Sequence, residues 1–197
     1  MGSESTWAAF YPEAAKNYDE SSIGISHVAE VVGVAAQKYG TRAAVSTQLP
    51  SGACATLNFN EVDRFSSDFA VYLREVVGVQ TGDSVALMSP NCIDFLLAVF
   101  GITKAGCICT NINPLYTAPE MEHQLKDAKA ETLVILGLYG DKVDAVISNT
   151  SVQRVITLSF LDFFPPVKKV VMGFVLKNVK KMVPKMCTGH VTMTCLL

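Results

Sequence analysis

The sequence has little charge and no long apolar run. Only 17% of its 197 residues are charged, and the formal net charge is −2, which excludes a protein whose whole surface is built for nucleic acid. The longest strongly apolar run, around residues 95–103, is far shorter than the roughly 20 residues that a membrane-spanning helix needs. No secretory signal precedes the cysteines. We therefore expect a cytoplasmic protein without a transmembrane helix.

The sequence also lacks a regular cysteine or metal-binding pattern. Its six cysteines are irregularly spaced, which favours a reducing compartment over a disulfide framework. Cys107 and Cys109 lie two residues apart in an apolar run, and a strand would place both side chains on one face. No second Cys or His pair with metal spacing accompanies them. We expect both to pack in the core, and we predict no metal site.

A glycine-rich phosphate loop is missing as well. None of the 13 glycines forms the GxGxxG or GxxxxGK[ST] spacing that arranges backbone amides around phosphates. His123 has no partner at an identifiable spacing, so we expect a structural role rather than acid–base catalysis. Asn113 follows a predicted strand and precedes a proline, at the edge where α/β proteins usually bind ligands, but a structural turn is the simpler interpretation. We predict no catalytic or cofactor-binding residue.

What the sequence does contain is a large apolar fraction, 50% of the chain, arranged in strand and helix patterns. From residue 84 on, short continuous apolar runs alternate with helical patterns. This is typical of an α/β fold with a doubly wound, mostly parallel sheet and helices on both faces. We predict that the last four strands lie side by side, buried and parallel. The predicted strands are residues 43–47 and 53–59, which form a hairpin, then 84–89, 107–112, 132–136 and 154–159; the predicted helices are residues 27–39, 60–77, 92–105, 118–128 and 141–148.

Charge divides the chain into unequal parts. Residues 1–162 hold 10 Lys/Arg and 18 Asp/Glu, a balance of −8, whereas residues 163–197 hold six Lys and no acidic residue. Two consecutive prolines, Pro165 and Pro166, stop the preceding strand pattern at this change. We predict an N-terminal arm over residues 1–24, an α/β domain over residues 25–162 and a basic amphipathic tail over residues 163–197.

The basic tail is expected to be helical over residues 167–183. Lys169, Lys177, Lys180 and Lys181 fall on one side of this helix, and apolar residues cover most of the other. One interpretation is peripheral contact with an anionic membrane, where each lysine near the lipid contributes about 1 kcal/mol. The other is that the apolar face packs against protein, either the remainder of a larger enzyme or another chain.

Several stretches, taken in order, resemble the AMP-forming acyl-CoA synthetases, which belong to the adenylate-forming enzymes. They are LNFNEVDRFSSDFAVYL, GDSVALMSPN, FGITKAG, NPLYTAPEMEHQLKDAKA and FVLKNVKKMVPK. The fourth stretch favours the bacterial-type long-chain and medium-chain fatty acid branch over the plant coumarate ligases. The resemblance covers residues 25–185 and implies part of the N-terminal domain of an adenylate-forming enzyme.

The resemblance implies that the complete enzyme converts fatty acid, ATP and CoA to acyl-CoA, AMP and pyrophosphate with the help of magnesium. The family's Thr/Ser/Gly-rich phosphate loop and its lysine on a small C-terminal domain have no counterpart in these 197 residues. We therefore expect a segment that is inactive alone and that binds no ATP, magnesium or CoA by itself. The alternative is a non-enzymatic α/β module that docks on a membrane or on a partner synthetase through its basic helix.

Overall fold

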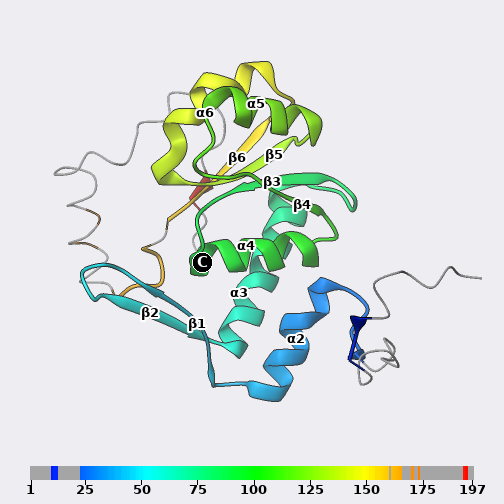
Figure 1. Ribbon diagram of the computed structural model, residues 1–197, viewed down its shortest axis with the longest axis vertical. Coiled ribbons are helices and arrows are strands. Elements are labelled where there is room, and N and C mark those ends of the chain that lie inside the picture. Colours follow the sequence, from blue (N-terminus) through cyan, green and yellow to red (C-terminus); the bar gives the residue numbers. More distant parts are fainter. Residues whose placement is uncertain are drawn as a thin grey trace, which may run out of the picture.

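A parallel sheet forms the centre of the molecule, and helices cover both of its faces (Figure 1). The computed structural model describes residues 10–12, 23–159, 161–165, 170, 173 and 193–194. The sheet has the strand order β4-β3-β5-β6-β7, and every neighbouring pair is parallel. Its strands are β3 (Ser84–Met88), β4 (Ile108–Asn111), β5 (Thr132–Leu136), β6 (Arg154–Leu158) and the two-residue β7 (Met193–Thr194). The predicted parallel arrangement of the four longer strands is confirmed.

The remaining elements also follow the predicted order. The strands β1 (Ala43–Gln48) and β2 (Cys54–Asn58) form a separate antiparallel hairpin, as predicted. Short 3-10 turns, η4 (Gly137–Tyr139) and η5 (Ile147–Asn149), flank the helix α6 (Gly140–Val146). The helices are α2 (Val28–Tyr39), α3 (Phe59–Val71) with its π-helical extension η3 (Tyr72–Val77), α4 (Ile93–Lys104), α5 (Ala118–Asp127) and α6 (Gly140–Val146).

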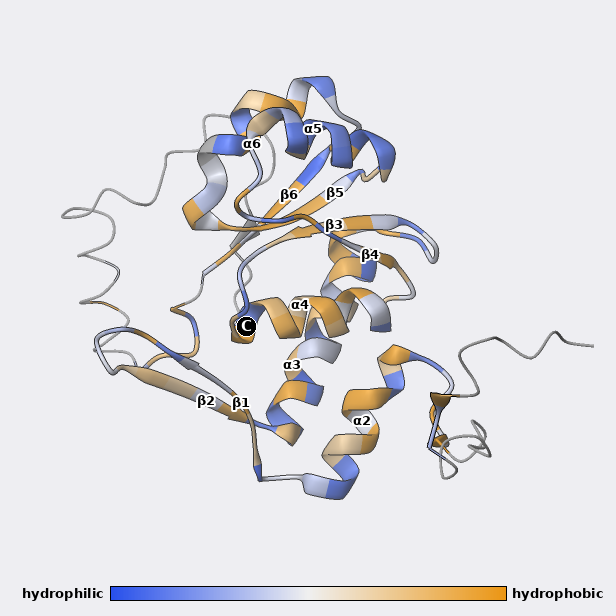
Figure 2. Ribbon diagram, viewed as in Figure 1, coloured by the Kyte–Doolittle hydropathy of each residue, from blue (hydrophilic) through white to orange (hydrophobic). Residues whose placement is uncertain are grey.

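Alternating residues of each central strand serve two different cores. Val85 and Leu87 pack with residues of α3 and α4 on one face, whereas Ala86 and Met88 pack with residues of α5 and α6 on the other. This follows from the two-residue period of a strand, and it explains why both faces read as continuous apolar runs. Figure 2 shows the apolar character along the strands and α4, and the hydrophilic surface of α5.

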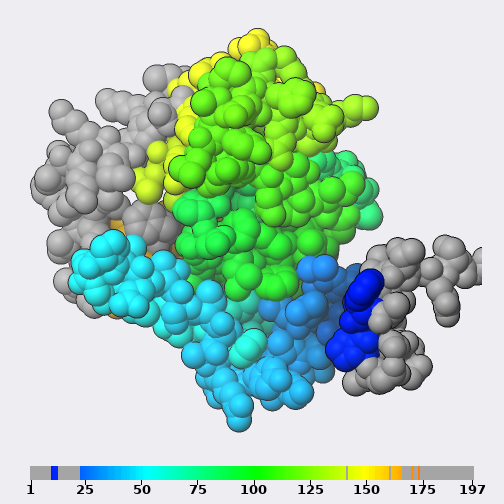
Figure 3. Space-filling model, in the orientation of Figure 1, coloured from blue at the N-terminus to red at the C-terminus, as the bar shows by residue number. Residues whose placement is uncertain are grey.

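A third core joins the hairpin to the helices below the sheet. Leu57 of β2, Val62 of α3 and Leu97 of α4 are buried together, and Leu161 and Phe164 from the segment after β6 complete this cluster. The residues that follow the last long strand therefore return to the hairpin side of the molecule. In Figure 3 the blue-to-cyan α2 and hairpin region and the green-to-yellow α5 and α6 region lie at opposite ends of the body.

The helix predicted over residues 60–77 begins earlier and changes its pitch before it ends. Its N-cap is Asn58 instead of Asn60: the Asn58 side chain accepts the Glu61 N–H at 2.9 Å, and the Glu61 carboxylate accepts the Asn58 N–H at 2.8 Å. The last turn is π-helical, which adds a residue to the turn. Val76 is therefore 59% exposed, and Val77 packs on the core.

The first turns of α2 and α4 are satisfied in different ways. Ser26 does not cap α2 with its side chain: His27 is the N-cap, and Ser26 donates its N–H and its hydroxyl to the Glu30 carboxylate. At α4 the N-cap is Cys92, without a side-chain cap, and Thr47 of the distant hairpin accepts the Ile93 N–H at 3.0 Å. Local sequence could not indicate a cap that comes from another element.

The strand β4 was expected to be buried, but it is partly exposed. It lies at the end of the sheet order with β3 as its neighbour, and Ile108 at its start is 59% exposed. The apolar pattern could not distinguish this edge strand from a central one. Cys107 and Cys109, which flank Ile108, pack on the same α3/α4 core, as predicted from their spacing.

The predicted tail helix over residues 167–183 lies outside the described residues, apart from Val170 and Gly173. The proposed surface of Lys169, Lys177, Lys180 and Lys181 also lies outside them, so it stays a prediction, as does the division into three regions. Among the residues that the structure describes, no helix is long and apolar enough to cross a membrane.

Candidate functional site

The strand order places a topological switch point at the carboxyl ends of β3 and β5. The chain leaves β3 through α4 to β4 on one side, and later returns to β5 on the other side of β3. The α4 helix packs on one face of the sheet, and α5 and α6 pack on the other. In open α/β sheets, ligands bind in the crevice outside the carboxyl ends of the strands at such a point. The candidate site is therefore formed by the loops that follow β3, β4 and β5.

The loop after β3 uses its polar groups internally. Ser89 is only 6% exposed, and its hydroxyl donates to the Pro90 carbonyl at 3.1 Å and lies 3.6 Å from Cys92 Sγ. Burial raises the pKa of the Cys92 thiol, so this thiol stays protonated and weakly nucleophilic at neutral pH. The loop therefore has the character of a packed connection and presents no activated nucleophile.

The loop after β4 forms a closed turn. The Asn113 side chain accepts the Leu115 N–H at 3.0 Å, and the Asn113 carbonyl accepts the Tyr116 N–H at 3.0 Å. Asn113 thus lies at the carboxyl edge, as expected from its position after a strand. Both of these acceptors are used in the turn, so the residue shapes the loop.

Lys142 ties this turn to the helix that follows β5. Its ammonium group donates to the Pro114 carbonyl at 2.7 Å and to the Tyr116 carbonyl at 2.6 Å. The same ammonium lies 5.6 Å from the centre of the Tyr139 ring, within the range of a cation–π contact. Lys142 therefore joins two of the three loops of the candidate site. The role of Lys142 could not be predicted from the sequence, because its hydrogen-bond partners lie more than 25 residues away along the chain.

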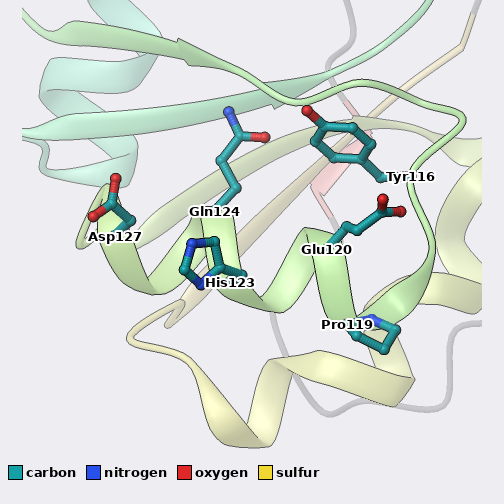
Figure 4. Close-up of a pocket in the computed structure, with 6 residues that line it drawn as sticks. All are labelled: Tyr116, Pro119, Glu120, His123, Gln124 and Asp127. Carbon is teal, nitrogen blue, oxygen red and sulfur yellow. The ribbon is translucent and has the colours of Figure 1, made fainter.

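A groove of 440 Å³ lies beside α5. Its lining residues come from α5 and from the loop that precedes it: Tyr116, Pro119, Glu120, His123, Gln124 and Asp127. In Figure 4 the Tyr116 ring and the Gln124 amide point toward the same space above α5. The Gln124 amide nitrogen donates to the Asn111 carbonyl of β4 at 2.8 Å, whereas its oxygen is buried without a hydrogen-bond partner. His123 is exposed on this surface, and its expected structural role stays a prediction.

The first turn of α5 depends on an ionised carboxylate. Glu120 accepts the Thr117 backbone N–H at 2.8 Å and the Thr117 hydroxyl at 2.7 Å, and the three-residue spacing of this pair is that of a capping box. These two hydrogen bonds lower the pKa of Glu120 from 4.5, and Lys142 lowers it further. A carboxyl group with a lowered pKa in the folded state contributes stability above its unfolded pKa and loses it as pH falls through the folded pKa.

We predict that acid loosens this turn locally. As pH falls below 4.5, the N–H groups of Thr117 and Met121, which are hydrogen-bonded in this turn, should lose hydrogen-exchange protection, after correction for intrinsic exchange, because Glu120 becomes protonated. Glu120→Gln should remove this pH dependence, while Asp127→Asn at the other end of α5 should retain it. Unchanged protection in the unaltered chain across this pH range would contradict the prediction. A local readout is needed because Glu30 and Glu122 also have lowered pKa values, through their contacts with Ser26 and Lys126.

The polar side chains described at the carboxyl edge bond within the protein. No group of three or more His, Cys, Asp or Glu residues in the described part of the chain could hold a metal. At the carboxyl edge, the Ser89 hydroxyl, the Asn113 side chain and the Lys142 ammonium all bond to the protein itself. Binding of ATP depends on backbone and cationic donors that are directed toward the phosphates, whereas Ser89 and Lys142 donate to backbone carbonyls of this chain.

Comparison with known proteins identifies the family. The family described as AMP-binding enzyme matches residues 33–184. The long-chain-fatty-acid–CoA ligase of Salmonella typhimurium is 41% identical over 129 residues, which cover 66% of this chain and 23% of the ligase. The corresponding ligase of Haemophilus influenzae is 40% identical over 134 residues, which cover 68% and 24%. The 4-coumarate–CoA ligase 1 of Petroselinum crispum is 31% identical over 98 residues, covering 50% and 18%.

A solved structure agrees with these relatives. The crystal structure of a long-chain-fatty-acid-CoA ligase from Archaeoglobus fulgidus superposes with a TM-score of 0.60 at 29% identity, over 66% of this chain and 26% of that one. The chain thus spans about a quarter of the length of the proteins that it matches. Its doubly wound α/β body has the fold of the N-terminal domain of adenylate-forming enzymes. The chain belongs to the AMP-binding enzyme family, within which it is similar to the bacterial long-chain fatty acid–CoA ligases.

Proposed function

We propose that this chain forms part of the N-terminal α/β scaffold of a fatty acid–CoA ligase and does not form acyl-CoA by itself. The observation that carries this proposal is the 40–41% identity with bacterial long-chain-fatty-acid–CoA ligases over two thirds of the chain. The longer protein would join a fatty acid to CoA, with ATP as the source of the adenylate. This chain would contribute the sheet on which the rest of that protein is built.

The internal bonding of the candidate site supports a scaffold role. Catalysis of phosphate and acyl transfer depends on donors and cations that are already aimed at the developing charge. Here Lys142, the cation at the carboxyl edge, holds the backbone carbonyls of Pro114 and Tyr116. The thiol at the same edge, Cys92, has a raised pKa. These groups shape and stabilise the loops, and the reacting groups would come from other parts of a ligase.

We expect no acyl-CoA production by the purified 197-residue chain. Palmitate, ATP, magnesium and CoA would be incubated with the chain, and acyl-CoA and AMP would be measured together by mass spectrometry. The Salmonella typhimurium ligase serves as the positive control, and a reaction without protein sets the background. Formation of AMP and acyl-CoA in equal amounts above this background would contradict the proposal.

The alternative, a non-enzymatic module that docks on a membrane or on a partner synthetase, rests on the basic tail. Its four lysines lie outside the described residues, and nothing in the described part of the chain favours it over the scaffold role. The two roles differ in one respect: the docking module would function without any further catalytic segment, whereas the scaffold would need one.

A further inference from the structure

We propose that the outer edge of β4, together with the groove beside α5, binds an extended peptide segment that carries lysine or arginine. This surface, called here the β4–α5 groove, consists of the outward backbone groups of β4 and of the groove-lining residues Tyr116, Pro119, Glu120, His123, Gln124 and Asp127. Such binding would not depend on which reaction a longer protein catalyses, because it needs only the outward backbone groups of β4 and the carboxylates of the groove.

The hydrogen-bond pattern shows which backbone groups of β4 are directed outward. The Ile108 N–H donates to the carbonyl of Asp83, just before β3, and the Ile112 N–H donates to the carbonyl of Leu87 in β3, each at 2.8 Å. Because successive residues of a strand alternate in direction, the N–H and C=O groups of Cys109 and Asn111 point away from β3. The Asn111 carbonyl confirms this direction, since it accepts a hydrogen bond from Gln124 of α5. Among the described residues, no strand pairs with this side of β4.

An edge of this kind is a template for an added strand. A row of outward N–H and C=O groups pairs readily with an extended segment, and several peptide-recognition domains bind their ligands in this way. The four residues of β4 would pair with about four or five residues of a peptide, since a strand rises about 3.3 Å per residue. The exposed side chain of Ile108 offers an apolar contact at one end.

Gln124 lies between the groove and the edge of β4. Its side-chain oxygen is buried and has no hydrogen-bond partner, although buried polar atoms are nearly always paired. The amide nitrogen of the same side chain bonds to the Asn111 carbonyl at the edge of β4. An added strand would therefore pair with the outward groups of Cys109 and with the Asn111 N–H.

The charge of the groove selects the kind of segment. Glu120 and Asp127 lie toward opposite ends of the groove wall that α5 forms (Figure 4), and the lowered pKa of Glu120 keeps that carboxyl group ionised to a lower pH than usual. A second copy of this chain would bring the same two carboxylates to the same edge, and like charges across paired strands are destabilising. A segment with lysine or arginine at its ends would instead place opposite charges beside these carboxylates.

Fluorescence anisotropy with labelled pentapeptides tests the proposal on the full 197-residue chain. The probe is Lys-Val-Thr-Val-Lys, and Glu-Val-Thr-Val-Glu is its charge-reversed control. We expect the lysine peptide to bind at least about tenfold more tightly. Two further probes carry N-methyl groups on alternate residues. In one probe the blocked amides face β4, and this peptide should bind at least about tenfold more weakly than the unmodified peptide. In the other probe the blocked amides face away from β4, and this loss of affinity should not occur.

Variants separate the edge from the charge. Asn111→Pro removes an outward N–H without removing a donor to β3, and it should weaken binding of the lysine peptide. The double variant Glu120→Gln/Asp127→Asn should abolish the preference for lysine over glutamate. Its matched control, Asp68→Asn/Glu75→Gln, makes the same change of charge on exposed residues of α3 and η3 and should retain the preference.

Each result bears on the proposal. Equal binding of the lysine, glutamate and N-methylated peptides, or no binding by a chain with an intact circular dichroism spectrum, would overturn it. A dimer in sedimentation that becomes a monomer in Asn111→Pro would also overturn it, in favour of pairing between copies. Competition by a synthetic peptide of residues 167–183 would support it, and would place the basic sequence of this chain in the class of ligands.

Discussion

Replacing Gly101 with alanine is expected to lower the free energy of unfolding by roughly 1–3 kcal/mol, although alanine is the better helix former. Gly101 lies in α4 where this helix crosses α3. A Cβ atom at this position would lie 2.5 Å from Phe69 Cδ1 and 3.0 Å from the Ser66 carbonyl oxygen. The Phe69 ring is buried, and the Ser66 carbonyl belongs to the α3 backbone, so both helices would have to shift. Urea unfolding followed by circular dichroism measures the effect.

Gly33→Ala in α2 is the matched control. A Cβ atom there would meet only Asp63 Oδ1, at the ordinary contact distance of 3.7 Å. This substitution should therefore raise the free energy of unfolding by about 0.5–1 kcal/mol, since alanine loses less backbone entropy on folding. If both substitutions shift stability in the same direction, the close crossing of α3 and α4 is not what requires glycine at position 101.

Lys104→Met is expected to lower the free energy of unfolding by roughly 2–3 kcal/mol. The Lys104 ammonium, at the end of α4, lies 2.7 Å from Asp63 Oδ1 and also bonds to the hydroxyls of Ser66 and Ser67, each at 2.9 Å. The lysine side chain is only 14% exposed, whereas that of Asp63 is 38% exposed. Water can therefore reach the abandoned carboxylate, which keeps the expected loss below that of a fully buried pair.

Two comparisons isolate the ion pair. Lys126→Met removes an exposed partner of Glu122 within α5 and should cost less than about 1 kcal/mol. The double variant Lys104→Met/Asp63→Asn should recover part of the lost stability, because it leaves no unpaired carboxylate. Equal losses for Lys104→Met and Lys126→Met in urea unfolding would show that the α3–α4 ion pair contributes no more than a surface pair.

The parallel sheet could be predicted from sequence because its signals are local. The runs that became β3, β5 and β6 are short, apolar and separated by helical patterns, and a strand–helix–strand connection favours parallel pairing. The hairpin was equally clear from the turn at residues 50–52. The edge position of β4 had no such signal, because an apolar run has the same appearance in a central strand and in an edge strand.

The candidate site was much less accessible to sequence reasoning. The position of Asn113 after a strand was predicted correctly because both of its signals are local: an apolar run precedes it, and a proline follows it. Lys142, Thr47 and Gln124 were missed, since each acts on a partner in a different element: the turn after β4, the start of α4 and the edge of β4. No local spacing relates such pairs, and only the packing of the elements brings them together.

The sequence by itself determined the α/β class, the order of the elements and the family resemblance, because all of these depend on residues close together in the chain or on motifs in a fixed order. Tertiary structure alone decided that β4 is an edge, that Lys104 and Lys142 are structural ties, and that Gly101 allows two helices to cross closely. The physical reason is that hydrogen bonding, burial and steric contact depend on distance in space, and a folded chain sets those distances independently of separation along the sequence.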